Sequence, residues 1–393
     1  MPAAVIVPDD HYTDSCDHCA VKGSPMPGHE PGSISLSSLP AGSMVGRAAE
    51  FSAIQRTLGR SRLVTITGLP GVGKTAVAIA AAAAASASFA DGAWLVPLDS
   101  LQDGDLLPNT VAHVLKVPGR RTGSRPEAAL DALLDDLRDR CLLLVLDTCE
   151  HVLGACTELA RKLLLLPCRD VRILATSREP LRAPGGLTVT VGPLPLRHAV
   201  TLFGRRAADA DAGFKITPDN RAAVEAICWQ LDRLPLAIEL AARRMACGSL
   251  EELHSQLEEG YWFLQDPAAV PARHKTLCAT IGWSYRLCTP AEQLLWARLS
   301  VFTGSFQVRD AQDVCADGHL PEQQIDALAD MLAARSVLRV DLHTGRHTRF
   351  RMPATIRAYG AGMLSPDDHE WERRYQAWQA GHQSRQRDTS GSG

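Results

Sequence analysis

The sequence predicts an α/β domain with a parallel sheet and helices on both faces, followed by a helical domain and a winged-helix domain. Three observations support this fold class. Short apolar runs alternate with helix-patterned segments between residues 48 and 192. Strand signals then stop, and amphipathic helical patterns continue to about residue 334. Two alternating runs, 336–342 and 347–353, are joined through a Gly-containing turn and predict a hairpin before a last helix at 354–364.

The elements of the α/β domain follow one another in a regular order. A helix at 48–59 precedes an apolar run that starts at Leu63, and four more strand-type runs are expected at 92–98, 141–147, 171–176 and 187–192. Helical patterns near 104–116, 126–140 and 152–166 separate these runs. Ligands of such sheets bind outside the carboxyl ends of the strands. We therefore expect any site at that edge.

Changes in composition and in hydrophobic pattern along the chain indicate the domain boundaries. We expect a disordered leader at 1–43, the α/β domain at 44–195, a helical domain at 196–266, the winged-helix domain at 267–364 and a polar tail at 365–393. The leader holds His11, Cys16, His18 and Cys19, which have the spacing of half a zinc site but lack a second Cys pair. An irregular leader without metal is the preferred interpretation.

The first strand leads into a phosphate-binding loop. Residues 63–75 read LVTITGLPGVGKT, which is Gly68-x4-Gly73-Lys74-Thr75 between a strand and a helix. Main-chain N–H groups of such a loop bind phosphate oxygens, Lys74 is expected to reach the β- and γ-phosphates, and Thr75 to ligate Mg²⁺. The pattern predicts a P-loop NTPase domain whose loop residues contact the nucleotide: Gly68, Gly71, Val72, Gly73, Lys74, Thr75 and Ala76.

Two later strands end in polar residues at the same predicted edge. The apolar strand 142–147 terminates in Asp147, which is typical of a second Mg²⁺ ligand. Glu150 either orients the attacking water or is a first-turn helix carboxylate stabilised by the helix dipole, and the sequence leaves both open. Arg178, after the strand 171–176, is the candidate sensor of the γ-phosphate. Lys74, Asp147, Glu150 and Arg178 form the predicted catalytic group.

Composition restricts the location and the class of partner. The chain has 393 residues, 46% hydrophobic, and a formal net charge of −3. Its apolar stretches are too short or too Ala-rich to span a bilayer, and the N-terminus lacks a charged segment followed by an apolar core. We expect a cytoplasmic protein without membrane contact.

These motifs together resemble the NB-ARC module of signal-transduction ATPases with numerous domains (STAND). The resemblance covers roughly 44–364 and rests on Val45-Gly46-Arg47, the loop Gly68 to Thr75, LVLDTCEH at 144–151, ILATSRE at 173–179 and LPLAIELA at 234–241. The subgroup that it resembles most is the predicted ATPases of actinobacterial regulators.

The resemblance implies a slow ATPase that acts as a switch between ADP- and ATP-bound arrangements. It further implies Mg²⁺ as cofactor, adenine contacts from Val45, Arg47 and Pro235, and a protein partner or self-oligomer in the ATP state. Three positions depart from the family pattern: Arg233 replaces a Gly, Thr148 replaces an acid or amide, and Pro353 stands where many relatives place a His on the ADP β-phosphate. Arg351 or Arg357 is the hypothesised substitute for that His.

Two other functions stay open at this point. Residues 335–357 contain six arginines against the single acid Asp341, which is compatible with a transcription regulator that binds DNA through its winged helix under nucleotide control. These arginines are Arg335, Arg339, Arg346, Arg349, Arg351 and Arg357. A metabolic kinase or motor is disfavoured, since the helical modules offer no evident pocket for a second substrate.

Overall fold

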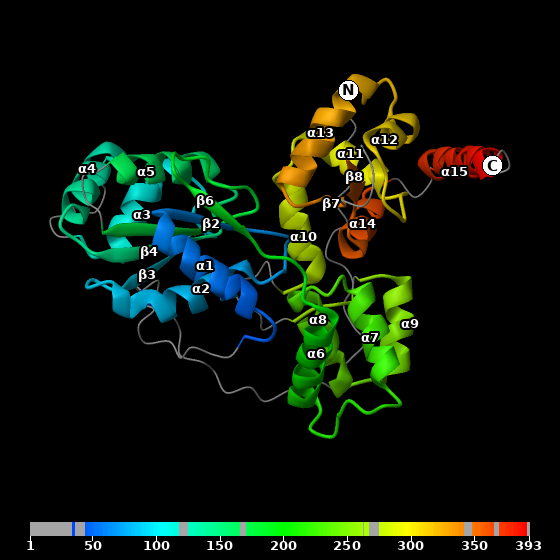
Figure 1. The fold of residues 1–393 in the computed structure, drawn as a ribbon, viewed down its shortest axis with the longest axis horizontal. Helices are drawn as coiled ribbons and strands as arrows, with labels where there is room; N and C mark the ends of the chain where they lie inside the picture. Colours follow the sequence, from blue (N-terminus) through cyan, green and yellow to red (C-terminus); the bar gives the residue numbers. More distant parts are fainter. Residues whose placement is uncertain are drawn as a thin grey trace. The chain divides into compact units, whose positions relative to one another are not determined.

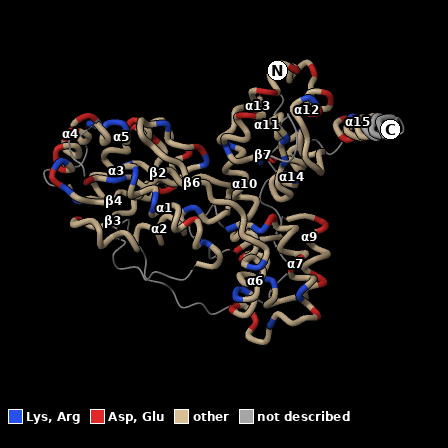
Figure 2. Tube along the Cα trace, in the orientation of Figure 1, with Lys and Arg blue, Asp and Glu red and all other residues tan. Residues whose placement is uncertain are grey.

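The computed structural model describes residues 34–35, 44–117, 125–165, 170–261, 263–266, 275–341, 348–364 and 369–390 (Figure 1). The His/Cys cluster expected near residues 11–19 and Arg346 lie outside these ranges. Figure 2 shows basic and acidic residues interspersed along the described chain.

A six-stranded sheet forms the centre of the first domain, with strand order β1-β3-β4-β5-β2-β6. The five strands from β2 to β6 are parallel, which confirms the predicted sheet. The strands are β1 (Ile34–Ser35), β2 (Leu63–Thr67), β3 (Ala93–Pro97), β4 (Leu142–Asp147), β5 (Val171–Thr176) and β6 (Leu187–Thr190). β1 pairs antiparallel with β3 although it belongs to the expected leader. Two residues are too short a run to show a strand period in the sequence.

Helices cover both faces of the sheet, because consecutive side chains of each buried strand point to opposite sides. In β4, Leu143 and Val145 pack into the cluster under α1 and α2, whereas Leu142, Leu144 and Leu146 pack into the cluster under α3, α4 and α5. The helices are α1 (Ala48–Arg60), α2 (Lys74–Ala85), α3 (Leu107–Val114), α4 (Pro126–Leu137) and α5 (Leu153–Leu165), with 3₁₀ turns at Ser86–Ser88 and Gly104–Leu106.

Four helices and a 3₁₀ turn form the predicted helical domain. They are α6 (Leu196–Ala210), α7 (Arg221–Gln230), α8 (Pro235–Arg243), the turn Arg244–Ala246 and α9 (Leu250–Glu259). Pro235 is the first residue of α8, where its missing N–H costs no helical hydrogen bond.

The winged-helix region contains four helices, a hairpin and a further helix, in the predicted order. They are α10 (Leu277–Arg286), α11 (Pro290–Leu299), α12 (Val308–Cys315), α13 (Glu322–Ala334), β7 (Arg339–Asp341), β8 (Arg349–Arg351) and α14 (Ala354–Ala361), followed by α15 (Glu370–Ser390). The N-terminus of α11 is well defined because Thr289 and Glu292 form a reciprocal capping box around Pro290.

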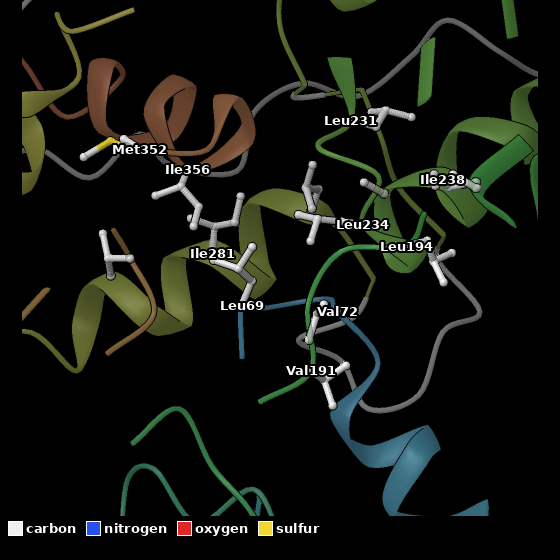
Figure 3. Packing of buried hydrophobic residues seen from close by; sticks show 14 of the residues in the cluster. Leu69, Val72, Val191, Leu194, Leu231, Leu234, Ile238, Ile281, Met352 and Ile356 are labelled. Carbon is white, nitrogen blue, oxygen red and sulfur yellow. The ribbon is translucent and has the colours of Figure 1, made fainter. Parts of the chain in front are cut away.

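One hydrophobic cluster runs from the phosphate-binding loop through the helical domain into the winged helix (Figure 3). Its labelled members are Leu69, Val72, Val191, Leu194, Leu231, Leu234, Ile238, Ile281, Met352 and Ile356. Burial of apolar area from all three modules stabilises this arrangement.

A polar contact supplements that packing. The Asp232 carboxylate, in the turn after α7, accepts the N–H of Ala354 at 2.9 Å and the N–H and hydroxyl of Thr355 at 2.8 and 2.7 Å. Asp232 thus caps α14 from another module. We call this contact the Asp232 latch.

Candidate functional site

The phosphate-binding loop lies between β2 and α2, at the carboxyl edge of the sheet, as predicted. Gly73 has φ of +95° at the N-terminus of α2, a left-handed conformation that favours glycine. At Gly68, with φ of +146°, a Cβ would collide with the carbonyl oxygen of Val191. Lys74 Nζ donates to the carbonyls of Gly68 and Leu69 at 3.0 and 3.2 Å, so the ammonium lies over the loop.

Three hydroxyls surround the carboxylate at the end of β4. Asp147 Oδ1 accepts the Thr75 hydroxyl at 2.7 Å and the Thr176 hydroxyl at 2.6 Å, and the Thr148 hydroxyl is 3.3 Å from Oδ2. Hard oxygen donors of this kind suit Mg²⁺, which usually takes only one or two protein ligands beside phosphate and water. The pair Thr75 and Asp147 therefore fits the predicted metal site.

Thr176 was missed by the sequence reasoning, which used the end of β5 only for Arg178. Its hydroxyl also accepts the N–H of Thr148 at 2.8 Å, and Thr148 has a left-handed φ of +66°. The pairing of β4 with β5 explains the position of Thr176. Leu146 of β4 pairs with Ala175 of β5, so the residues that follow them, Asp147 and Thr176, are neighbours.

The candidate sensor and the candidate water-orienting acid form an ion pair. Arg178 Nε lies 3.3 Å from Glu150 Oε1, and the two side chains are only 7% and 10% exposed. Glu150 lies in the turn before α5, which begins at Leu153, so it is not a first-turn helix residue. The carbonyl of Arg178 accepts the hydroxyl of Ser336 from the winged helix at 3.3 Å.

A second ion pair continues this contact into the winged helix. Arg335 Nε lies 3.0 Å from Glu292 Oε1 and 3.6 Å from Glu179 Oε1, and its Nη1 donates to the carbonyl of Leu287. Glu292 is completely buried. The segment that carries Arg178 is therefore bound to the winged helix on two sides.

A pocket of about 380 Å³ opens beside these groups, within the usual size range of small-molecule sites. It is lined by residues of the loop, of the strand ends, of α8 and of α10: Pro70, Gly71, Gly73, Lys74, Thr75, Ala76, Ile79, Thr148, Glu150, Thr176, Arg178, Pro235, Leu236, Glu239 and Thr280. Pro235, for which an adenine contact is predicted, is among them. Glu239 and Thr280 were not predicted, because only the fold brings α8 and α10 to the loop.

Val45 and Arg47, expected to contact adenine, are not among the residues that line this pocket. The Arg47 guanidinium, 3% exposed, donates to the carbonyls of Gly192 and Val72 and to Glu50, each at 2.7 Å. In this arrangement Arg47 fixes the rear of the phosphate-binding loop. Satisfied buried guanidinium groups of this kind are hard to distinguish from ligand-binding ones by sequence alone.

Arg351 and Arg357, the hypothesised substitutes for a family histidine, do not line the pocket either. Arg351 is exposed on β8, and Arg357 lines a separate cavity against α15. Pro353 forms the N-cap of α14, which the Asp232 latch holds. Of the winged-helix region, Thr280 lines the pocket beside the phosphate-binding loop.

Fewer arginines of the winged helix are exposed than the sequence indicates. Arg335 pairs with Glu292, and Arg349 Nη2 donates to the carbonyl of Ser305 at 2.6 Å. Arg339 and Arg351 are exposed on the hairpin. In the described ranges no cluster of three or more His, Cys, Asp or Glu could hold a metal ion, and no described helix is long and apolar enough to cross a membrane.

Comparisons with known proteins agree with this architecture. Residues 287–365 match the model of a family described as a winged helix-turn-helix domain. A Walker-type ATPase of Pyrococcus abyssi has a similar fold, with a TM-score of 0.53, 13% identity and coverage of 83% of this chain and 99% of that one. A STAND protein of Pyrococcus horikoshii has a TM-score of only 0.37, at 15% identity, over 86% of this chain and 46% of that chain, which is too low to establish the NB-ARC subgroup.

Mycobacterial proteins are similar in sequence. An "Uncharacterized protein" of Mycobacterium tuberculosis is 36% identical over 327 residues, 82% of this chain and 81% of its own length. A "Putative HTH-type transcriptional regulator" of the same organism is 37% identical over 313 residues, 78% of this chain but only 34% of the regulator. With its P-loop ATPase fold and its winged helix-turn-helix domain, this chain belongs to the family of these mycobacterial proteins.

Proposed function

We propose that this protein is an ATP/ADP-dependent switch of the NB-ARC/STAND type, with slow ATP hydrolysis, that acts in transcription regulation or signal transduction. The observation that carries the proposal is the position of Arg178. Its side chain faces the phosphate pocket and pairs with Glu150, while its carbonyl and the neighbouring Glu179 are bonded to the winged helix. A change at the nucleotide can therefore reach the winged helix through one short segment.

The residues present fit Mg²⁺ and a triphosphate. Thr75 and Asp147 would hold the metal ion, which stabilises the charge of the transferred phosphoryl group. Lys74 and the loop N–H groups would bind the phosphate oxygens. Glu150 pairs with Arg178 through Oε1 alone, so its other carboxylate oxygen could accept a hydrogen bond from the attacking water.

The free energies of these contacts are large enough to drive a switch. A shift of a two-state population from 1:99 to 99:1 needs about 5.5 kcal/mol of differential affinity. A charge-assisted hydrogen bond contributes roughly 1.5–3 kcal/mol. A γ-phosphate that engages Arg178, Lys74 and a metal ion on Asp147 can supply this difference. In the ATP state we expect a protein partner or a second copy of the chain to bind.

Calorimetry with ADP and ATP, each with Mg²⁺, tests the proposal. Lys74→Ala should lose most of the affinity for both nucleotides, since it removes the phosphate-binding cation. Arg178→Ala should bind ADP like the parent protein but distinguish ATP poorly. Unchanged binding by Lys74→Ala would reject the nucleotide site. An unchanged ATP/ADP ratio in Arg178→Ala would reject the sensor role alone.

The second candidate is a DNA-binding regulator whose affinity for DNA depends on the nucleotide. It is favoured by the winged helix-turn-helix match and by the name of the mycobacterial regulator. The two candidates are compatible, since DNA binding would be one output of the same switch.

A further inference from the structure

A group of basic residues lies in the segments next to the Asp232 latch. It comprises Arg233, in the turn between α7 and α8, together with Arg339 and Arg351 of the hairpin. Trp229, at the end of α7 and 55% exposed, lies beneath the Arg233 guanidinium. We call these four residues the basic face.

Two observations indicate that the three arginines of the basic face lie near one another. Arg339 and Arg351 are direct Cα partners in the antiparallel hairpin, so their side chains share one face. The Asp232 latch joins the turn that carries Arg233 to the segment just after β8. In agreement with this, burial and then the charge of Arg339 lower the pKa of Arg233, while the charge of Asp232 raises it. Like charges gathered in this way destabilise the free protein unless a polyanion neutralises them.

Three acids near the basic face have hydrogen-bond or ion-pair partners outside it. The Asp232 carboxylate accepts hydrogen bonds from the N-terminus of α14, although its charge also acts on Arg233. On α7, Glu225 pairs with Arg221 at 2.9 Å. On the hairpin, Asp341 accepts the hydroxyl of Ser305 at 3.2 Å.

Arg233 is held in place at a conformational cost. Its φ of +56° is left-handed, a region that glycine adopts freely and other residues rarely enter. The guanidinium carbon lies 4.2 Å from the centre of the Trp229 ring, within the range of a cation–π contact. A strained backbone that positions an arginine over an exposed tryptophan is typical of a functional position.

We propose that the basic face binds the sugar–phosphate backbone of duplex DNA without reading its sequence. Planar guanidinium groups pair well with phosphate oxygens. The Arg233 guanidinium covers one face of the Trp229 ring, so that face is not available for base stacking. The basic face thus combines Arg233 of the helical domain with the two arginines of the β7–β8 hairpin.

This placement links DNA binding to the switch. Arg233 belongs to the helical domain and Arg339 and Arg351 to the winged helix, and the Asp232 latch joins the two modules beside them. A rearrangement that opens the latch divides the basic face. The inference takes its partner class from the regulatory role proposed above, but binding of DNA by these residues does not require nucleotide hydrolysis.

Fluorescence anisotropy with a labelled random-sequence duplex, over a series of salt concentrations, tests the proposal. The triple variant Arg233→Gly/Arg339→Ala/Arg351→Ala should bind at least about tenfold more weakly and show a salt slope reduced by about 2–3, since each lost phosphate contact removes about 0.9 from the slope. Arg233→Gly alone should weaken binding while it keeps the fold, because glycine suits the left-handed turn. Unrelated duplex sequences should give equal affinities.

Arg205→Ala is the matched control, since it removes an exposed arginine of α6 outside the basic face and should leave DNA binding unchanged. The proposal would be overturned if the parent protein and the triple variant had equal affinity for DNA and equal salt slopes. It would also be overturned if these arginines were needed for binding to poly-glutamate while the protein did not bind DNA. Calorimetry with ATP separates this result from the proposed switch: Lys74→Ala should lose nucleotide yet keep DNA binding, and the triple variant should do the reverse.

Discussion

Replacement of Asp232 by alanine should release α14 and favour the ATP-bound arrangement. The carboxylate accepts three hydrogen bonds at 2.7–2.9 Å at the N-terminus of α14. Loss of a helix N-cap costs about 0.5–2 kcal/mol, and loss of the charge at the helix dipole adds about 0.3–1 kcal/mol. With the additional Thr355 hydroxyl bond, we expect Asp232→Ala to destabilise the contact by about 2–3 kcal/mol.

That free energy predicts a measurable change in nucleotide preference. At about 1.4 kcal/mol per decade, 2–3 kcal/mol changes the equilibrium constant of the latch by about 30- to 140-fold. Hydrogen exchange of the α14 amides, residues 354–361, should become faster by a similar factor, and calorimetry should show a higher ratio of ATP to ADP affinity. The assay reports the latch directly because these amides belong to the helix that Asp232 caps.

Asp232→Gly is the matched control for backbone strain. Asp232 has a left-handed φ of +52°, which alanine tolerates about 1–2 kcal/mol less well than glycine. The glycine variant loses the same hydrogen bonds without that strain and should be the milder of the two. If α14 exchanges at the parent rate in both variants, the carboxylate does not hold the modules together and the reasoning is wrong.

Two further predictions concern the metal site and the winged helix. Thr176→Val removes a hydroxyl that donates to Asp147 at 2.6 Å, so affinity for ATP with Mg²⁺ should fall about tenfold while ADP binding without Mg²⁺ stays the same, as calorimetry would show. Hydrogen bonds from Arg298 lower the pKa of Asp317 to about 2, so this pair stabilises the fold above about pH 4 and loses its contribution as the pH falls toward 2. Asp317→Asn should therefore cost about 1 kcal/mol at neutral pH, after a discount for partial solvent screening, and should flatten the acid limb of a thermal-unfolding profile.

The main chain of the site could be predicted because its signals are local. The loop from Gly68 to Thr75 and the strand that ends in Asp147 each combine a strand period with a residue of defined chemistry. The same holds for the helices of the winged helix, where caps such as Thr289 fix the boundaries. These elements appear where the sequence indicated them.

The parts that could not be predicted depend on which groups the fold brings together. Arg47 was expected to contact adenine and Arg335 to belong to a basic wing, yet carbonyls and Glu50 bind Arg47, and a carbonyl and the buried Glu292 bind Arg335. Asp232 looks like a turn residue, and its partner lies more than a hundred positions away in α14. No periodicity or spacing encodes such pairings, because they depend on the packing between modules.

The pairing of Arg178 with Glu150 makes the proposed switch a competition between two anions for one guanidinium. Both side chains are nearly buried, so separation without a new partner would leave an uncompensated charge at a cost of several kcal/mol. In the proposed switch a γ-phosphate would supply a new partner for Arg178 but not for Glu150, which would need the attacking water or another donor in its place. If the movement of Arg178 includes its main chain, it would stretch the hydrogen bond from the Ser336 hydroxyl to the Arg178 carbonyl. ATP would then weaken the winged-helix contact only to the extent that the phosphate binds Arg178 more strongly than Glu150 does, whereas ADP, which lacks that phosphate, would leave the contact intact.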